Sequence, residues 1–286
     1  MTLGIIGGSG LYEIDWLEYP RREKVISPFG APSDELLTGE ADGIRLVFLP
    51  RHGKGHRITP SEVNYRANID ALKRAGVTDV IAFSAVGSLR EELAPGTFVI
   101  PDQFIDRTFA RQKSFFGTGM VGHVSMAQPV CARLGDALAA AAAAAGVPAV
   151  RGGISLVMEG PQFSTRAESD LHRSWGCSVV GMTSMPEAKL AREAELCYAT
   201  VAMVTDYDCW RVDEAHVTAE QVVAVMEQNI VAARALLRRV VPRLRDRSVP
   251  CPHGCDRALD GALMTAPPSR DPAVVAQLGA VMGRLL

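Results

Sequence analysis

The sequence predicts a single α/β domain with a mixed central β-sheet flanked by helices. Short apolar runs of strand length alternate along the chain with stretches of helical length, which is the pattern of an α/β fold. Several of the runs lack the alternation of a half-exposed strand, so we expect a sheet that is covered on both faces. The 286 residues, 48% of them hydrophobic, suffice for a full core without disulfide or metal staples.

The first expected strand, residues 3–6, ends in Gly-Gly-Ser-Gly and therefore enters a tight turn. Further apolar runs of strand length lie at 44–49, 80–83, 98–100, 154–158, 178–180 and 199–204.

Helices are expected at 61–75, 131–145, 166–175, 186–195 and 219–244. Seven consecutive alanines end the second of these, and alanine is the strongest helix former. The longest carries an apolar stripe at three- and four-residue spacing: Val222, Val223, Met226, Ile230, Ala233 and Leu236. No Pro/Gly/Ser-rich linker divides residues 1–245, which we expect to form the domain. Residues 246–286 predict an extension packed on it, with a surface excursion before a last short helix.

Charge and hydropathy exclude two classes of partner. Thirty Lys and Arg against 32 Asp and Glu leave a net charge of -2, without the positive excess that nucleic-acid binding needs. No run of about 18 apolar residues and no signal-peptide pattern is visible, so we expect no membrane partner and a cytoplasmic protein.

The six cysteines do not form a dense secreted framework, and we expect mostly thiols. Cys251 and Cys255 enclose His253, but a structural zinc site needs a second ligand pair that the local sequence lacks. The sequence therefore predicts no metal, and ordinary thiols or a local disulfide at this loop.

Two glycine-rich or basic segments follow expected strands. In residues 4–10, backbone amides and the hydroxyl of Ser9 can approach an anion closely, although a tight turn without a ligand explains the glycines equally well. Arg51 offers a planar fork for two phosphate oxygens and His52 a further bond, the alternative being a solvated basic loop.

Two more segments place polar groups after apolar strands. Small residues in 84–93 can bring backbone amides near an oxyanion. Asp206 and Asp208 follow the strand at 199–204, and ligands of α/β sheets gather beyond the carboxyl ends of strands. A surface turn or a cation site are the other interpretations of this acidic pair.

Taken together, these segments resemble the trimeric purine nucleoside phosphorylases, and within them the branch that acts on 5′-methylthioadenosine. The resemblance spans residues 4 to about 240 in order, and the tail from 245 contributes nothing to it. It rests on the stretches GIIGGSGL, PRHGKGH with PSEVNYRANIDALK, SAVGSLREEL with PGTFVIPDQFIDRT, MEGPQFSTRAES, and GMTSMPEAKLAREAELCYATVAMVTDYDCW.

The resemblance implies a pentosyltransferase of purine and methionine salvage. Inorganic phosphate, a co-substrate, would attack the anomeric carbon through an oxocarbenium-like state and release adenine and 5-methylthioribose 1-phosphate, with no cofactor. The residues carried over as phosphate-binding are Ser9, Arg51, His52, Ser84, Ala85 through its backbone, and Thr183.

For the nucleoside, the resemblance places Met182 under the ribose and Phe163 against the ligand. Ser164 and Asp206 match the adenine-specific branch, whereas relatives that act on 6-oxopurines carry Glu and Asn there. A protonated Asp206, with Asp208 beside it, would give its proton to N7 of the leaving base, which requires a raised pKa. Gly181 departs from this branch and looks more like the 6-oxopurine enzymes.

At the 5′ end, the resemblance implies a homotrimer, with hexamers as a further possibility, in which His123 reaches a neighbouring subunit's site. Ala219 and Val223 would line an apolar pocket, and the small Ala219 predicts extra room there. The alternatives are a broad-specificity or 6-oxopurine phosphorylase, and a nucleoside-binding module without turnover.

Overall fold

The computed structural model describes residues 1–8, 10–11, 14–211, 219–247 and 249–286, with the backbone alone at 219–222. The strands of the described part form one eleven-stranded mixed sheet. They are β1 (Thr2–Gly7), β2 (Glu18–Glu23), β3 (Leu36–Ala41), β4 (Ile44–Pro50), β5 (Asp79–Ser88), β6 (Phe98–Ile100), β7 (Gln103–Asp106), β8 (Ala149–Arg151), β9 (Ile154–Val157), β10 (Val179–Gly181) and β11 (Cys197–Asp206).

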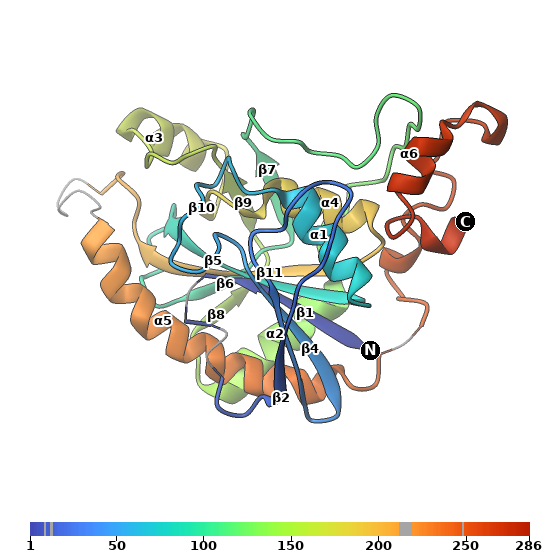
Figure 1. Cartoon of the computed structure of the whole chain (residues 1–286). Helices are drawn as coiled ribbons and strands as arrows, with labels where there is room; N and C mark the ends of the chain where they lie inside the picture. Colours follow the sequence, from blue (N-terminus) through green and yellow to red (C-terminus); the bar gives the residue numbers. More distant parts are fainter. Residues whose placement is uncertain (9, 12–13, 212–218, 248) are drawn as a thin grey trace.

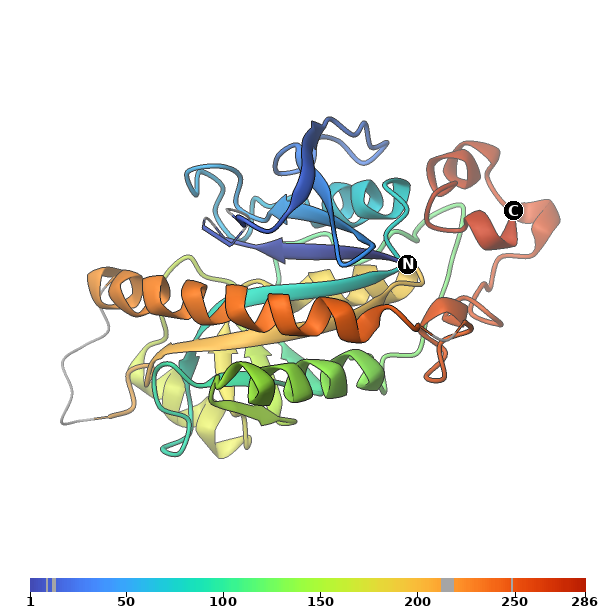
Figure 2. The same cartoon turned by 90° about the horizontal axis from the view of Figure 1, so that it is seen from below.

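Helices cover both faces of this sheet. They are α1 (Tyr65–Arg74), α2 (Ala132–Ala145), α3 (Arg166–Ser174), α4 (Ser184–Glu193), α5 (Ala219–Val240) and α6 (Pro272–Gln277), with 3₁₀ turns η1 (Val241–Leu244), η2 (Cys255–Arg257), η3 (Pro267–Ser269) and η4 (Gly283–Leu285). Helices α2 and α5 lie side by side on one face, and α1 and α4 lie on the other (Figures 1 and 2). The predicted α/β class is confirmed.

Strand β5 is the centre of the sheet. The order β2-β3-β4-β1-β5-β10-β9-β7 runs through it, while β11 pairs with both β5 and β6, and β6 also pairs with β8. The parallel neighbours β1 and β11 flank the first half of β5, and the antiparallel β10 meets its end. Almost every residue of β4, β5 and β11 is buried, as the uninterrupted apolar runs predicted.

Several element boundaries differ from the sequence-based expectation. The strand predicted at 80–83 continues to Ser88, so Ser84 and Ala85 belong to β5 instead of following it. Helix α1 begins at Tyr65 and not at residue 61, because the Asn64 side chain caps it by accepting the amide of Ala67. Strands β2 and β3 were not predicted, since their residues are largely polar or interrupted by glycine.

The apolar stripe of the long helix is only partly buried. Ala233 and Leu236 are fully buried against the sheet, but Val223 is 58% exposed in the single chain. Met226, one turn further along α5, already packs against the core, and Asn229 donates to the carbonyl of Val204 at 3.0 Å.

The C-terminal residues pack on both sides of the core. Cys251 and Cys255 join the cluster formed with α2 and α5, whereas Leu259, Leu278 and Met282 join the cluster formed with α1 and α4. The predicted last short helix is α6, which Asp271 caps through the amides of Ala273 and Val274. None of the described helices is long and apolar enough to cross a membrane.

Candidate active site

The sheet opens at the middle of β5. Residues 79–82 pair with β1, and Gly87 and Ser88 pair with β10, so that in the described structure residues 83–86 have no ladder partner on this edge. On the opposite edge β11 stays paired throughout. A place where a strand changes neighbours leaves a crevice at the strand ends, and ligands of α/β sheets bind in such crevices.

Arg51 fills one side of this opening. It follows β4, and its backbone amide donates to Gly7 at 2.9 Å. Its Nη1 donates to the backbone carbonyl of Phe83 in β5 at 2.8 Å. Its Nε and Nη2 donate to the two carboxylate oxygens of Glu187 at 2.8 and 3.0 Å. These bonds use three of the five N–H donors of the guanidinium, and one on each Nη remains to bind an anion.

The charge of Arg51 is fixed by its surroundings. The side chain is 2% exposed, and burial alone would lower its pKa, but the charge and hydrogen bonds of Glu187 outweigh burial and the pKa is raised. Tyr198 donates to Glu187 at 2.9 Å and completes a buried chain of three side chains. Such a pair holds the guanidinium rigidly in place.

His52 is neutral in this environment. Burial and the charge of Arg51 lower its pKa to about 4. Its Nδ1 lies 2.8 Å from the carbonyl oxygen of Ile58, and the ring stacks on His56 with centroids 4.3 Å apart. Since a carbonyl only accepts, Nδ1 carries the proton and Nε2 is left as an acceptor, suited to a protonated phosphate oxygen.

Ser84 and Thr183 meet on the other side of the opening. Their hydroxyl oxygens lie 3.0 Å apart, and both residues are 7% exposed. Thr183 directly precedes α4, whose backbone is interrupted at Met185, and its side chain makes no capping bond, so its hydroxyl can contact a ligand as well as Ser84. Ala85, the next residue of β5, is exposed.

Arg111, which no sequence signal singled out, fixes the segment around Thr183. It donates to the carbonyls of Met182 at 2.6 Å and Met185 at 2.7 Å, and also to the backbone and side chain of Glu159. It was missed because it follows no strand or glycine motif. Glu187 was missed as well, because α4 also contains Lys189, Arg192 and Glu193, and the sequence does not show which of these charged side chains faces the core.

The two aspartates lie at the far end of the opening. Asp206 accepts from the Thr205 hydroxyl at 2.7 Å and from the Asp208 amide at 2.8 Å. Burial raises the pKa of Asp206, with the charge of Asp208 acting in the same direction and the two hydrogen bonds opposing. Burial also raises the pKa of Asp208, whose Oδ2 is buried without a hydrogen-bond partner in the described structure.

Gly87 allows this approach. A Cβ at Gly87 would lie 3.0 Å from Oδ1 of Asp206 and 3.2 Å from the Cβ of Asp208. A side chain there would therefore displace the acidic pair. The short stretch from Ser84 to Gly87 thus joins the basic end of the site to its acidic end.

The remaining nucleoside-site candidates lie at different distances from this centre. Ser164 is close to the acidic end, since its carbonyl accepts from the Cys209 thiol at 3.2 Å. Met182 directly precedes Thr183, and Phe163 is 49% exposed. Ser9 and the side chain of Ala219 lie outside the described residues, and Val223 projects from the exposed half of α5.

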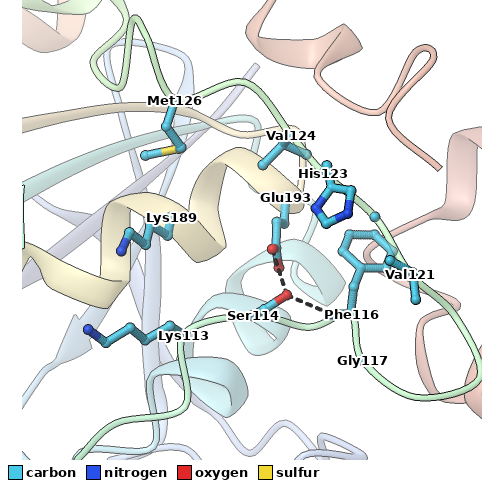
Figure 3. A pocket seen from close by; sticks show the side chains of 11 residues that line it. Lys113, Ser114, Phe116, Gly117, Val121, His123, Val124, Met126, Lys189 and Glu193 are labelled. Carbon is cyan, nitrogen blue, oxygen red and sulfur yellow. Dashed lines mark hydrogen bonds between the residues drawn. The ribbon is translucent and has the colours of Figure 1, made fainter. Parts of the chain in front are cut away.

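His123 is placed elsewhere in the chain. It lines a cavity of about 420 Å³ together with Lys113, Ser114, Phe116, Lys189 and Glu193, among others (Figure 3). This cavity contains none of the phosphate candidates, although α4 borders both places. A single chain therefore does not bring His123 to the opening beside β5.

Comparisons of the sequence and the fold with those of known proteins identify the family of this chain. The family model described as the phosphorylase superfamily matches residues 2–242, and the chain belongs to this family. Its similar relatives are S-methyl-5′-thioadenosine phosphorylases. That of Rhodospirillum rubrum is 61% identical over 285 residues, covering 100% of this chain and 97% of the relative. That of Cereibacter sphaeroides is 61% identical over 99% of this chain and 98% of the relative.

Solved structures show the same likeness. A methylthioadenosine phosphorylase from an Antarctic soil metagenomic library has a TM-score of 0.91 and 44% identity, with 98% of each chain covered. The methylthioadenosine phosphorylase of Schistosoma mansoni, in complex with adenine, has a TM-score of 0.82 and 37% identity over 99% of this chain and 98% of the other.

Proposed function

We propose that this protein cleaves 5′-methylthioadenosine with inorganic phosphate to give adenine and 5-methylthioribose 1-phosphate. The observation that carries the proposal is the opening along β5, which has an anion site at one end and a buried acidic pair at the other. Phosphorolysis needs both, because an anionic nucleophile must be held on one side of the sugar while the departing base receives charge compensation on the other.

Phosphate would lie between Arg51, Ser84 and Thr183. The two free N–H groups of Arg51, the two hydroxyls and the amides around Ala85 supply donors, and neutral His52 accepts from a protonated phosphate oxygen. No resident cofactor enters this scheme. Ser9 completes the set on the strength of the family resemblance alone.

The purine would lie against the acidic pair. A protonated Asp206 donates to N7 of the leaving base, and its raised pKa supports this role. Asp208 and Ser164 would read the 6-amino group, a donor that favours an acceptor. Met182 and Phe163 would contact the sugar and the ligand.

The 5′ end would be completed by a neighbouring subunit. His123 lines a cavity apart from the β5 opening, and in the homotrimer that we propose, alone or paired into a hexamer, it would reach the site of a neighbouring subunit. The pocket would include Ala219 and Val223 from the start of α5. Val223 is exposed in the single chain, as expected of a residue that faces a ligand or a neighbouring subunit.

We place the enzyme in the cytoplasm.

The phosphate site can be tested with single hydroxyl deletions. Ser84→Ala and Thr183→Ala each remove one bond to a charged ligand, so we expect the KM for phosphate to rise about 10- to 100-fold while the KM for the nucleoside changes little. Thr200→Ala is the matched control, because its buried hydroxyl bonds Ala82 within the sheet. An unchanged KM for phosphate in both site variants would refute the assignment of the phosphate site.

The wild-type protein also tests the alternative of a nucleoside-binding module. If it binds the nucleoside without turnover, a binding module is favoured over an enzyme.

A 6-oxopurine or broad-specificity phosphorylase is the second candidate, favoured by Gly181. This residue has no side chain beside the acidic end, where a Cβ would already lie 3.1 Å from Val86. Comparison of kcat/KM for methylthioadenosine, adenosine, methylthioinosine and inosine separates the two functions. A preference for inosine would overturn the assignment of Asp206.

A further inference from the structure

Four cysteines from three distant parts of the chain meet in the core. Cys131 precedes α2, Cys197 begins β11, and Cys251 and Cys255 belong to the C-terminal segment. All four are buried, with exposures of 3% or less. Their Sγ atoms all lie within 4.8 Å of one another. The second ligand pair that the loop 251–255 lacks in sequence is thus supplied by the fold.

One pair of the sulfurs has the spacing of a tetrahedral metal centre. With Zn–S bonds of about 2.3 Å, tetrahedral geometry places the sulfurs about 3.8 Å apart. Cys131 and Cys251 have their Sγ atoms 3.8 Å apart. Buried thiols that only fill space have no reason to converge four at a time, and soft thiolate sets of this kind select zinc among the common divalent ions.

The loop that carries two of the sulfurs is shaped by its own bonds. Gly254 has a φ of 66°, a left-handed conformation that turns the chain between the two cysteines. Its amide donates to the carbonyl of Cys251 at 2.9 Å, and the carboxylate of Asp256 accepts the amide of Cys251 at 2.9 Å. Three residues separate Cys251 from Cys255, a spacing found in structural zinc sites, while His253 points to solvent.

Positive charge surrounds the sulfurs. Arg247 donates to Sγ of Cys197 at 3.7 Å, and Arg133 also lies beside Cys197. Both arginines contact the buried carboxylate of Asp79, and Arg247 also contacts the carboxylate of Asp256 at 3.5 Å. The Nε groups of both are buried and have no well-aligned hydrogen-bond acceptor in the described structure. A zinc ion with four thiolates carries two negative charges, and the two guanidinium groups beside Cys197 are placed to stabilise that charge.

We propose that Cys131, Cys197, Cys251 and Cys255 bind one structural Zn²⁺ ion that fastens the C-terminal segment to the α/β core. Each thiol releases its proton to solvent as its sulfur bonds the metal, and four protein ligands leave no open position for catalysis. The segment held in this way contacts the chain at His123, since Ala262 accepts the amide of His123 at 2.8 Å. This proposal is independent of the catalytic function.

Metal analysis tests the proposal directly. The full chain, purified under reducing conditions without chelator, should contain about one zinc per chain by plasma mass spectrometry. Cys251→Ser and Cys131→Ser should lose it. Cys177→Ser and Cys209→Ser are the matched controls, because these cysteines lie outside the cluster, and both should retain the metal.

A second measurement keeps the test decisive if the cluster variants fail to fold. Titration of the wild type with a mercurial should release zinc to a chromogenic indicator, and cobalt reconstitution should give the thiolate-to-cobalt charge transfer of a tetrahedral four-sulfur site. Metal-free protein with six free thiols would overturn the proposal. So would bound iron in place of zinc, or an intact mass that shows disulfides among the four cysteines.

Discussion

Arg51 combines two requirements that normally conflict, because it is deeply buried and yet is available to an anion. Glu187 compensates its charge on one side and Tyr198 holds Glu187, so the guanidinium stays fixed without occupying all its donors. In the proposed reaction, phosphate would meet donors that are already oriented, and little reorganisation would be needed.

Asp206 is the residue whose protonation state matters most for the proposed reaction. Its raised pKa keeps a larger fraction protonated at a given pH, and the protonated form is the one that donates to the base. Turnover of methylthioadenosine is therefore expected to fall as pH rises through that pKa.

Replacement of this acid should change both rate and preference. We expect Asp206→Asn to lower kcat for methylthioadenosine by about 100-fold, the typical contribution of a general acid, and to abolish the alkaline fall of the pH profile. Activity on inosine should rise relative to activity on methylthioadenosine. The amide of Asn can donate a hydrogen bond to a 6-oxopurine, although it cannot transfer a proton to the base. Steady-state kinetics with both substrates measure this, with exposed Asp170→Asn as control. An unaltered kcat and pH profile would exclude Asp206 as the acid.

Glu193, which borders the cavity of Figure 3, should make stability depend on pH. Burial raises its pKa to about 7, although Phe115 and Ser114 donate hydrogen bonds to it. A carboxyl with a raised folded-state pKa contributes stability below its unfolded pKa of 4.5 and loses it as pH rises through about 7.

The neutral substitution Glu193→Gln tests this. Relative to wild type, the variant should be more stable at pH 9 by up to about 3 kcal/mol and should show little gain at pH 4. Urea unfolding at both pH values measures the difference, and Glu227→Gln on the exposed face of α5 is the control. Equal stability differences at the two pH values would contradict the burial of an ionisable Glu193.

At the scale of elements, β5 organises the site because it changes neighbours halfway along. Its first half pairs with β1 and its last residues pair with β10, and the residues between them face the ligand opening. Gly87 then lets the end of β11 approach, so that Asp206 lies beside β5. The position of the acidic pair depends on one missing side chain.

Gly87→Ala should therefore reduce catalysis by displacement of Asp206. We expect kcat/KM for methylthioadenosine to fall about 10- to 100-fold, since small misplacements of reacting groups are costly, with the KM for phosphate little changed. Gly283→Ala, where an added Cβ meets nothing within 4 Å, is the control. Wild-type kinetics in Gly87→Ala would show that the approach of the two strands is not required.

The sequence predicted the elements that carry strong local patterns. Uninterrupted apolar runs identified β1, β4 and β11, and the alanine run identified α2, which ends at Gly146 in a left-handed cap. It did not predict β2, whose residues are mostly charged and exposed, because its pairing with β3 is decided by backbone bonds.

The sequence pointed to part of the candidate site. Arg51, Ser84 and Asp206 lie in or directly after apolar runs that predicted strands, and Thr183 was named by the family resemblance alone. Arg111 and Glu187 could not be located in this way, because their roles depend on partners 48 to 136 residues away in the chain. Contacts of this range arise only when the sheet is assembled.

At the scale of the whole molecule, the C-terminal segment links the core to the face that carries His123. Ala262 accepts the amide of His123 and Met264 donates to the carbonyl of Val121, while Leu278 and Met282 pack with α1 and α4. The segment thus holds His123 at a cavity that contains none of the phosphate candidates.

His123→Ala should affect the nucleoside and not phosphate. If a neighbouring subunit's site uses His123, the KM for methylthioadenosine should rise about 10-fold while the KM for phosphate is unchanged, and light scattering should give three times the chain mass of 30.7 kDa. Exposed His253→Ala is the control. A fully active monomer would contradict both the trimer and the shared site.

Phosphate-dependent cleavage of methylthioadenosine tests the account most directly. Purified protein is incubated with this nucleoside, with and without inorganic phosphate, and adenine and the sugar product are separated and quantified. We predict that equal amounts of adenine and 5-methylthioribose 1-phosphate form only when phosphate is present. Adenine release that does not depend on phosphate, or no release at all, would contradict the assignment of the β5 opening as a phosphorolysis site.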